Sequence, residues 1–362
     1  MKILHILTDT NIGGAGRYLL ALLESYDRDN FQMEVVLPIG SQLAPAITAL
    51  DVPVLEAQYI SDRSLSAKGI GSLNHIIKER KPDLVNTHAS FSGRIAAKLQ
   101  GIPVIYTRHY CVPKDKSGKG KASFINNIFS SGVIATSPEV EAGLIATGTK
   151  PEHITTIYNG VPPVKSISDE EKLTLRTHYG IAPDTFVISQ IARLDPVKGH
   201  DHTLDVAKLL ANDPNILILL AGDGPLKDHL SRRIKEESIT NVLMIGFVSE
   251  VEKIINITDL QINASYTETT SLALLEGMSL GIPAVVTNGG GNPYVISDGE
   301  QGLVVPCGDA EALAKAVLKI RGDPELYQQM SNKSLETYNK NFRADNMARQ
   351  IEALYKTYQK GR

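Results

Sequence analysis

The sequence predicts an α/β protein made of two doubly wound domains, each with a parallel sheet covered by helices on both faces. Its 362 residues exceed what one hydrophobic core usually serves, and this favours two domains. Short continuous runs of β-branched residues alternate with segments that repeat apolar residues at helical spacing. The alternation pauses once near the middle and then restarts, which divides the chain into two α/β domains.

The first domain is predicted over residues 1–162. Its first strand is followed by a glycine-rich loop and by apolar residues at helical spacing between Tyr18 and Leu23. The segment Asn159–Pro163 interrupts the pattern and predicts the linker to the second domain. We expect the strands of this domain at 3–7, 35–37, 84–85, 104–106, 133–135 and 154–158.

The second domain is predicted over residues 163–340, where βα alternation restarts. Its strands are expected at 186–191, 216–220, 242–245, 260–262, 284–286 and 303–305. Residues 341–362 predict a final helix that could cover either domain, including by packing back on the first. Its apolar face consists of Met347, Ile351, Leu354, Tyr355 and Tyr358.

Composition and charge exclude several classes of protein. The apolar share of 42% and the charged share of 21% are ordinary for a globular chain, and the net charge of −3 gives no reason to expect nucleic-acid binding. No apolar run approaches the ~18 residues of a membrane helix, and the N-terminal MKILHILTD predicts a strand and no secretory signal. Cys111 and Cys307 are too few for a disulfide framework or a metal cluster, which favours the reducing cytoplasm.

A glycine-rich turn, Gly13–Arg17, lies between the first strand and the first helix. Glycines let a ligand approach the backbone, and a helix N-terminus attracts anions. The dinucleotide fingerprint G-x-G-x-x-G fails here, because Leu19 stands where the third glycine belongs. A tight turn without a ligand is the alternative.

A second motif, Arg193–Gly199, follows the first strand of the second domain. Arg193 and Lys198 could converge on one anion, since arginine offers a planar fork and lysine a mobile point charge. Taken alone, such a loop is more often simply solvated. In the next motif, Ala221–Pro225, Gly222 gives room for a neighbouring ligand in what is otherwise an ordinary turn.

The densest motif is Glu268–Gly277, which flanks a helix start. Thr270 or Ser271 could cap that helix, whose free N–H groups would receive a phosphate. Glu268 and Glu276 could accept hydrogen bonds from hydroxyl groups on either side of it. A phosphate between two polyhydroxylated groups describes a nucleotide sugar; the alternative is an amphipathic helix with Glu276 exposed.

In this order the motifs resemble the GT-B glycosyltransferases of the large retaining group called family 4, or glycosyl transferases group 1. The likeness extends over essentially the whole chain. It is carried by GGAGRY, NGV, RLDPVKG, AGDGP, the E-x7-E segment and GMSLGIPAVVTNGGG. The resemblance implies two Rossmann-like domains that face a cleft, with a C-terminal helix.

The resemblance also implies roles for the matching residues. Arg193 and Lys198 would bind the donor diphosphate, Glu276 the ribose hydroxyls, and Glu268 hydroxyls of the transferred sugar. His109 would face the sugar across the cleft, so the implied catalytic residues are His109, Glu268, Arg193 and Lys198. The other implied donor contacts are Gly14, Gly222, Phe247, Val248, Thr270, Ser271 and Leu272. No metal and no cofactor are implied.

Two segments depart from the family pattern. Thr269–Ser271 stands where a Gly-Phe-Pro-like tripeptide is common, which leaves the donor sugar open. Pro293–Ile296 lacks the carboxylate that often follows the glycine run, so no role is carried over to it.

Four other features have competing interpretations. Asp27–Asp29 imitates a metal-binding D-x-D but is expected to be a solvated turn, and His200–His202 is not expected to bind metal. His88 either reaches the cleft or caps the next helix. The basic stretch 108–121 favours a phosphorylated lipid acceptor or an anionic membrane surface, or is an exposed loop.

The function implied is a cytoplasmic retaining hexosyltransferase, with peripheral membrane contact as an option. It would move a sugar from a nucleotide donor, UDP favoured over GDP, to a glycan or lipid-linked acceptor of the cell envelope or an exopolysaccharide. A sugar-nucleotide 2-epimerase and a non-catalytic nucleotide-sugar-binding protein on the same fold are the alternatives.

Overall fold

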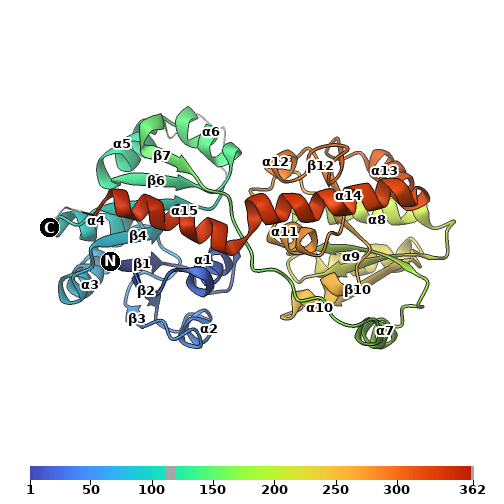
Figure 1. Cartoon of the computed structure of the whole chain (residues 1–362), viewed down its shortest axis with the longest axis horizontal. Helices are drawn as coiled ribbons and strands as arrows, with labels where there is room; N and C mark the ends of the chain where they lie inside the picture. Colours follow the sequence, from blue (N-terminus) through green and yellow to red (C-terminus); the bar gives the residue numbers. More distant parts are fainter. Residues whose placement is uncertain (111–118, 360–362) are drawn as a thin grey trace. The chain divides into compact units, whose positions relative to one another are not determined.

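The structure, a computed structural model, describes residues 1–110 and 119–359. The chain divides into two compact units, which we call unit 1 and unit 2 (Figure 1). Unit 1 comprises Met1–Val161 together with the C-terminal segment that begins at Arg343, and unit 2 comprises Pro162–Phe342.

Within the described residues, unit 1 contains a seven-stranded sheet in which all strands pair in parallel. The order across the sheet is β3-β2-β1-β4-β5-β6-β7. The strands are β1 (Lys2–Leu7), β2 (Gln32–Pro38), β3 (Val54–Ala57), β4 (Leu84–His88), β5 (Val104–Arg108), β6 (Gly132–Ala135) and β7 (Ile154–Thr156).

Helices cover both faces of this sheet (Figure 1). Three of them begin at a serine, Ser66, Ser90 or Ser137, whose side-chain oxygen accepts a backbone N–H of the first turn. The helices are α1 (Gly14–Ser25), α2 (Ala44–Thr48), α3 (Ala67–Arg80), α4 (Phe91–Leu99), α5 (Lys119–Phe129), α6 (Pro138–Ala146) and the 3-10 turn η2 (Pro151–His153).

Unit 2 repeats the design, with a six-stranded parallel sheet among its described residues in the order β10-β9-β8-β11-β12-β13. Its strands are β8 (Phe186–Ile191), β9 (Ile216–Ala221), β10 (Val242–Gly246), β11 (Leu260–Asn263), β12 (Ala284–Thr287) and β13 (Gly302–Val305). Its helices are α7 (Asp169–His178), η3 (Pro196–Lys198), α8 (His200–Leu210), α9 (Lys227–Glu236), α10 (Val251–Asn256), α11 (Leu272–Ser279), α12 (Asn292–Val295), α13 (Ala310–Gly322) and α14 (Pro324–Thr337).

The chain leaves unit 1 after Val161 and returns to it at Arg343, and these two residues form a β-bridge. The return follows α14 through a π-helical turn, η4 (Tyr338–Phe342), into the last helix, α15 (Ala344–Thr357). The N–H of Ala344 donates to the carbonyl of Val161 at 3.0 Å. The segment that leaves unit 1 and the segment that returns to it are therefore hydrogen-bonded to each other.

Helix α15 belongs to the core of unit 1. Met347, Ile351 and Tyr355 are fully buried beside α1, and Leu354 and Tyr358 are partly buried against the same cluster. The hydroxyl of Tyr355 also accepts a hydrogen bond from Asn86 in β4. From the sequence, the apolar face of this helix could have covered either domain. In the structure it packs on the sheet of unit 1.

One strand escaped prediction. β3 (Val54–Ala57) has four residues at the edge of the sheet, and Glu56 within it is exposed. An edge strand that is half exposed lacks the continuous apolar run by which buried parallel strands are recognised. The predicted strand at 186–191, in contrast, coincides with β8.

Replacing Ile351 with alanine should destabilise unit 1 by about 2–5 kcal/mol, because the side chain is fully buried and its removal leaves a cavity. Replacing the exposed neighbour Gln350 with alanine is the matched control and should change little. Urea unfolding followed by probes in each unit would measure this. A loss confined to unit 2, or equal effects of the two variants, would contradict the packing of α15.

Candidate donor-binding site

Both sheets reverse their winding direction at one point. The predicted site residues follow strands at the carboxyl edges of the sheets, some beside that point and others one or two strands away. In unit 2 the reversal lies between β8 and β11, and in unit 1 it lies between β1 and β4. Parallel strands send the loops at their carboxyl ends to one edge of the sheet, and the crevice at the reversal is where open α/β sheets bind ligands. Site residues far apart in sequence are thereby brought to the same edge.

The loop after β8 is pressed against the end of β11 at Gly199. This residue has a φ of +67°, and a Cβ atom there would lie 2.1 Å from the carbonyl oxygen of Ala264. Only glycine meets both demands. The N–H of Tyr266 also donates to the carbonyl of Val197 at 2.8 Å. The backbone of the Arg193–Gly199 motif is therefore fixed against the loop that carries Glu268.

That approach pairs Lys198 with Glu268. The ammonium Nζ donates to the carboxylate Oε2 at 2.6 Å, and the two side chains are only 22% and 11% exposed. The sequence assigned the two residues to different parts of one donor and did not reveal that they contact each other. Their separation of 70 positions hides the pair from any local pattern.

Arg193 is exposed, and none of the described residues forms an ion pair with it. Its loop packs on the loop after β9, where Gly222 has a φ of +152° and a Cβ would lie 1.9 Å from the carbonyl oxygen of Ala192. Gly222 thus serves close packing between two loops. Arg193 stands on this edge with its guanidinium available to an anion.

Helix α11 begins at the same edge. Ser271 caps it by accepting the N–H of Leu274, so of the two candidate caps Ser271 is the one used. The hydroxyl of Thr270 is buried and finds no hydrogen-bond partner among the described residues. Beside it, the N–H of Gly291 donates to the carbonyl of Glu268 at 2.7 Å, so the glycine run after β12 supports the loop that precedes the helix.

Glu276 lies on the second turn of α11 and is only 9% exposed. The alternative in which Glu276 points to solvent on an amphipathic helix is therefore wrong. The first turn of this helix carries no acidic residue, so its N-terminal N–H groups and dipole favour a negative ligand. Leu272, the first helical residue, supplies one of these groups.

Phe247 and Val248 follow β10, the strand beyond β9. Phe247 is 77% exposed, whereas Val248 is half-buried against an apolar cluster. The N–H of Gly222 donates to the carbonyl of Gly246 at 2.7 Å and ties this strand end to the loop after β9. An exposed aromatic ring at this edge offers a flat surface for stacking.

In unit 1 the glycine-rich turn leads into α1. Gly14 is exposed with open space where a side chain would be, and the first turn of α1 contains no acidic residue. The turn is thus open to an anion. His109 follows β5 at the same edge of this sheet and is half-buried.

His88 has a role other than those considered for it. It ends β4 with its ring buried, while Ser90 caps α4, so His88 does not cap the next helix. Its Nδ1 lies 2.8 Å from Nε2 of His109, and its Nε2 lies 3.1 Å from Nδ1 of His5 in β1. The sequence carried one clue, since the three histidines occupy strands that a doubly wound sheet places side by side.

The features that imitate metal sites are used for structure. Asp27 accepts hydrogen bonds from its own turn, including the N–H groups of Asp29 and Asn30. Asp201 forms an ion pair with Arg233. The neighbouring His200 is buried, and this burial, together with the charge of Lys198, lowers the pKa of His200 to about 4. Residues 1–110 and 119–359 contain no cluster of three or more histidine, cysteine or acidic residues suited to a metal.

Of the basic stretch 108–121, residues 111–118 lie outside the described part of the chain, and so does Cys111.

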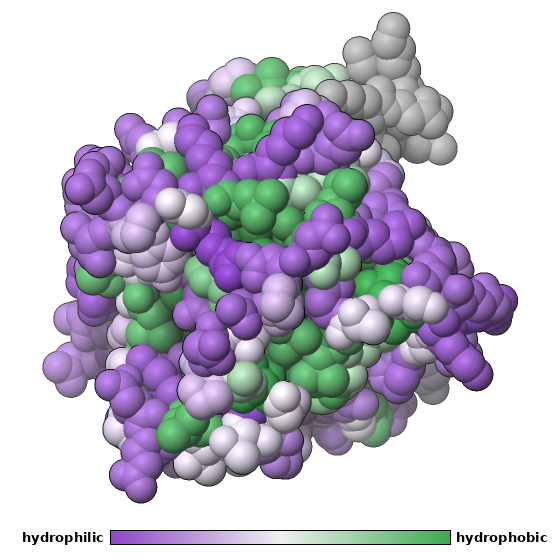
Figure 2. All heavy atoms as spheres, turned by 90° about the vertical axis from the view of Figure 1, so that its right-hand side faces the viewer, coloured by the Kyte–Doolittle hydropathy of each residue, from purple (hydrophilic) through white to green (hydrophobic). Residues whose placement is uncertain are grey.

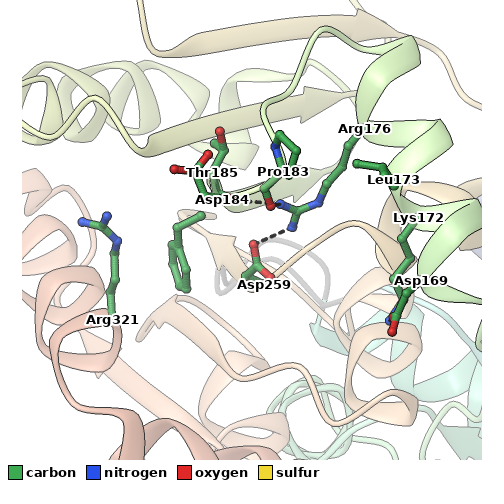
Figure 3. Close-up of a pocket in the computed structure, with 10 residues that line it drawn as sticks. Asp169, Lys172, Leu173, Arg176, Pro183, Asp184, Thr185, Asp259 and Arg321 are labelled. Atoms are coloured by element: carbon green, nitrogen blue, oxygen red, sulfur yellow. Dashed lines mark hydrogen bonds and ion pairs between the residues drawn. The ribbon is translucent and has the colours of Figure 1, made fainter.

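A hollow of about 580 Å³ lies at the opposite, amino edge of the sheet in unit 2 (Figure 3). Arg176 points into it from α7 and pairs with Asp259 at 2.9 Å, while Lys172 lies 3.6 Å from Asp169. Arg321 on the other side pairs with Asp213. These charges are already paired, and the hollow is far from the carboxyl ends of the strands, where the predicted donor residues lie.

Two family models match successive parts of the chain. "Glycosyltransferase Family 4" matches residues 12–165, and "Glycosyl transferases group 1" matches residues 171–337. Together they span most of both units. The chain therefore belongs to the family 4, or group 1, glycosyltransferases, and its two doubly wound units form the GT-B fold of that family.

Individual relatives share about a quarter of their aligned residues with this chain. The chain is 26% identical over 350 residues to UDP-Gal:alpha-D-GlcNAc-diphosphoundecaprenol alpha-1,3-galactosyltransferase of Escherichia coli, which covers 90% of this chain and 89% of that protein. It is 25% identical over 307 residues to N-acetyl-alpha-D-glucosaminyl L-malate synthase of Bacillus anthracis, covering 81% and 78%.

Solved structures share the fold. Anabaena Alr3699/HepE in complex with UDP-glucose matches with a TM-score of 0.87 at 22% identity, over 99% of this chain and 100% of that one. Sucrose-phosphate synthase of Thermosynechococcus elongatus matches with a TM-score of 0.80 at 18% identity, over 99% of each chain.

Hydrophobic areas interrupted by hydrophilic side chains occupy the face of the protein shown in Figure 2. Among the described helices, none combines the length and the apolar character that a membrane crossing requires.

Removing both partners of the Lys198–Glu268 pair should cost less stability than the sum of the two single losses. We expect a coupling of about 1–2 kcal/mol among Lys198→Met, Glu268→Leu and the double variant, because either partner alone is a poorly solvated charge. The exposed pair Lys315–Glu311 is the matched control and should couple by less than ~0.5 kcal/mol. Urea unfolding without ligand gives these values, and equal coupling in the two pairs would contradict the contact.

Proposed function

We propose that this glycosyltransferase is a retaining hexosyltransferase whose unit 2 binds a nucleotide sugar, with UDP preferred to GDP. The observation that carries the proposal is the gathering of Arg193, the Lys198–Glu268 pair and the start of α11 at the carboxyl edge of one sheet. Positive charge and helix N–H groups suit a diphosphate, and the buried carboxylate of Glu276 suits the hydroxyls of a ribose.

Each side chain then has a distinct partner on the donor. Arg193 and Lys198 contact diphosphate oxygens, helped by the N–H groups at 270–272. Glu268, in the loop before α11, accepts hydrogen bonds from the transferred sugar. Phe247 stacks on the base, with Val248 beneath it. The hydroxyl of Thr270, buried at the helix start, supplies one further donor for a phosphate oxygen.

The departing diphosphate gains negative charge in the transition state. Arg193, Lys198 and the dipole of α11 stabilise that charge without a metal ion. Glu268 is held by Lys198 at 2.6 Å, and Glu276 is buried on its helix. Neither carboxylate is placed as a free nucleophile, so we propose attack of the acceptor on the same face from which the diphosphate leaves, with retention of configuration.

The acceptor is proposed to be a glycan or a lipid-linked sugar bound by unit 1. The Escherichia coli relative is named for transfer from UDP-Gal to a sugar on diphosphoundecaprenol, and the Anabaena structure holds UDP-glucose. These names support a UDP-sugar donor and an acceptor of the cell envelope.

A panel of UDP- and GDP-sugars, with release of nucleoside diphosphate as the readout, tests the proposal. A transferase releases UDP only when a suitable acceptor is present, whereas a 2-epimerase converts the donor without acceptor and a binding protein converts nothing. Anomeric analysis of the product by NMR then decides between retention and inversion. An inverted product, or turnover with GDP-sugars alone, would contradict the corresponding part of the proposal.

The two glutamates should differ in their effect on nucleotide binding. Glu276→Gln should weaken both UDP and the whole donor by about 10-fold or more, because a hydrogen bond to a charged group is lost. Glu268→Gln should leave UDP affinity nearly unchanged and lower turnover, since its partner is the sugar.

Calorimetry with UDP alone, beside kinetics with the complete donor, makes the comparison. Glu311→Gln, on the exposed side of α13, is the control and should alter neither quantity. Equal weakening of UDP by both site variants would mean that the carboxylates are not divided between ribose and sugar.

A further inference from the structure

Three histidines form a hydrogen-bonded row inside unit 1. His5, His88 and His109 come from β1, the end of β4 and the residue after β5, which are neighbours in the sheet. Their ring nitrogens lie 3.1 and 2.8 Å apart. The ring centroids are 5.5 and 5.1 Å apart and the planes are inclined by only 26° and 14°, so the rings lie edge to edge. The family resemblance implies a role only for His109 and leaves the other two unexplained.

Counting protons shows that the three rings cannot choose their tautomers independently. A neutral imidazole carries one N–H, and each nitrogen–nitrogen contact requires one proton between its two atoms. With three neutral rings, two protons occupy the two contacts and the third must sit at one end of the row. That proton is either on Nε2 of His5 or on Nδ1 of His109, and all three rings change tautomer together between the two arrangements.

The buried nitrogen at the inner end of the row, Nε2 of His5, decides between the two tautomer arrangements. Nε2 of His5 is fully buried and has no hydrogen-bond partner within the described residues. An unpaired buried N–H is rarer in proteins than an under-used acceptor, so this nitrogen is better left without the proton. The outer end differs: His109 is half-buried, and no described residue is bonded to its Nδ1. The third proton therefore belongs on Nδ1 of His109.

We propose that His88 is a positioning residue that fixes His109 as a neutral hydrogen-bond donor through Nδ1–H, with His5 as the buried end of the row. The chain of donation runs from His5 Nδ1 to His88 Nε2, and from His88 Nδ1 to His109 Nε2. The group that His109 meets is consequently an acceptor oxygen of the ligand, and His109 acts there without charge. Which ligand supplies that oxygen depends on the function proposed above; the tautomer does not.

The surroundings keep the row neutral. Burial lowers the pKa of His5 to about 3, and burial together with the charge of Arg108 lowers the pKa of His109 to about 3. Burial and the two neighbouring rings lower the pKa of His88 as well. The titratable groups that face the row from the packed helices are Tyr18 of α1, whose ring lies 4.8 Å from His109, and Tyr355 of α15, 6.3 Å from His5. Neither tyrosine supplies the negative charge that would hold a proton on the row.

Nitrogen NMR of protein with ¹⁵N-labelled histidine tests the tautomer directly in the free enzyme. We expect a protonated Nδ1 and an unprotonated Nε2 on all three rings, with no titration between pH 5.5 and 8. A proton on Nε2 of His109, an even mixture of tautomers, or a charged ring in that range would overturn the proposal.

Variants separate positioning from simple packing. His88→Leu removes the donor to Nε2 of His109, so the tautomers of His109 should mix, and kcat/KM should fall about 3–10-fold, the worth of one hydrogen bond. His5→Leu is the matched control: it removes an equivalent buried contact but leaves the bond from His88 to His109, so Nδ1 of His109 should stay protonated. His88→Asn places an amide N–H where Nδ1 was and should restore the tautomer.

Two outcomes contradict the positioning role: an unchanged tautomer in His88→Leu, or a mixed tautomer in both leucine variants. The function proposed above fails separately. If the row has the expected tautomer but His109→Ala transfers sugar at the wild-type rate, the tautomer stands and the contact between His109 and a ligand does not.

Discussion

Parallel pairing is the constraint on which the rest of this protein depends. Every strand in both described sheets runs in the same direction as its neighbours, so every loop that follows a strand emerges at one edge. The order of strands then decides which loops meet, and the meeting point is the reversal between β8 and β11 in unit 2 and between β1 and β4 in unit 1. The residues that we propose to bind the donor lie on the loops at this edge of unit 2.

Close backbone contact turns neighbouring loops into one site. Gly199 rests on Ala264, Gly222 rests on Ala192, and the N–H of Gly291 reaches the carbonyl of Glu268. A side chain at either of the first two glycines would force the loops apart. Lys198 and Glu268 are within 2.6 Å because of this packing, so an ammonium and a carboxylate from distant positions in the sequence are held in a common geometry.

The sequence predicted the buried strands and the site motifs because both are local signals. Apolar runs such as 186–191 mark strands that are covered on both faces, and glycine with charged residues marks the loops after them. What it could not predict depends on contacts between distant positions: the Lys198–Glu268 pair is 70 residues apart, and His5 and His88 are 83 apart. The edge strand β3 was not predicted because its local signal is weak: a half-exposed strand lacks the continuous apolar run of a buried one.

Hydrogen–deuterium exchange with and without UDP tests the central claim most directly, because it shows where on the chain the nucleotide binds. The account predicts protection in unit 2 at the loops after β8, β9 and β10 and at the start of α11, which include 193–199, 222–225, 247–248 and 268–276. Protection at the hollow around Arg176 and Asp259 instead, or protection confined to unit 1, would contradict it.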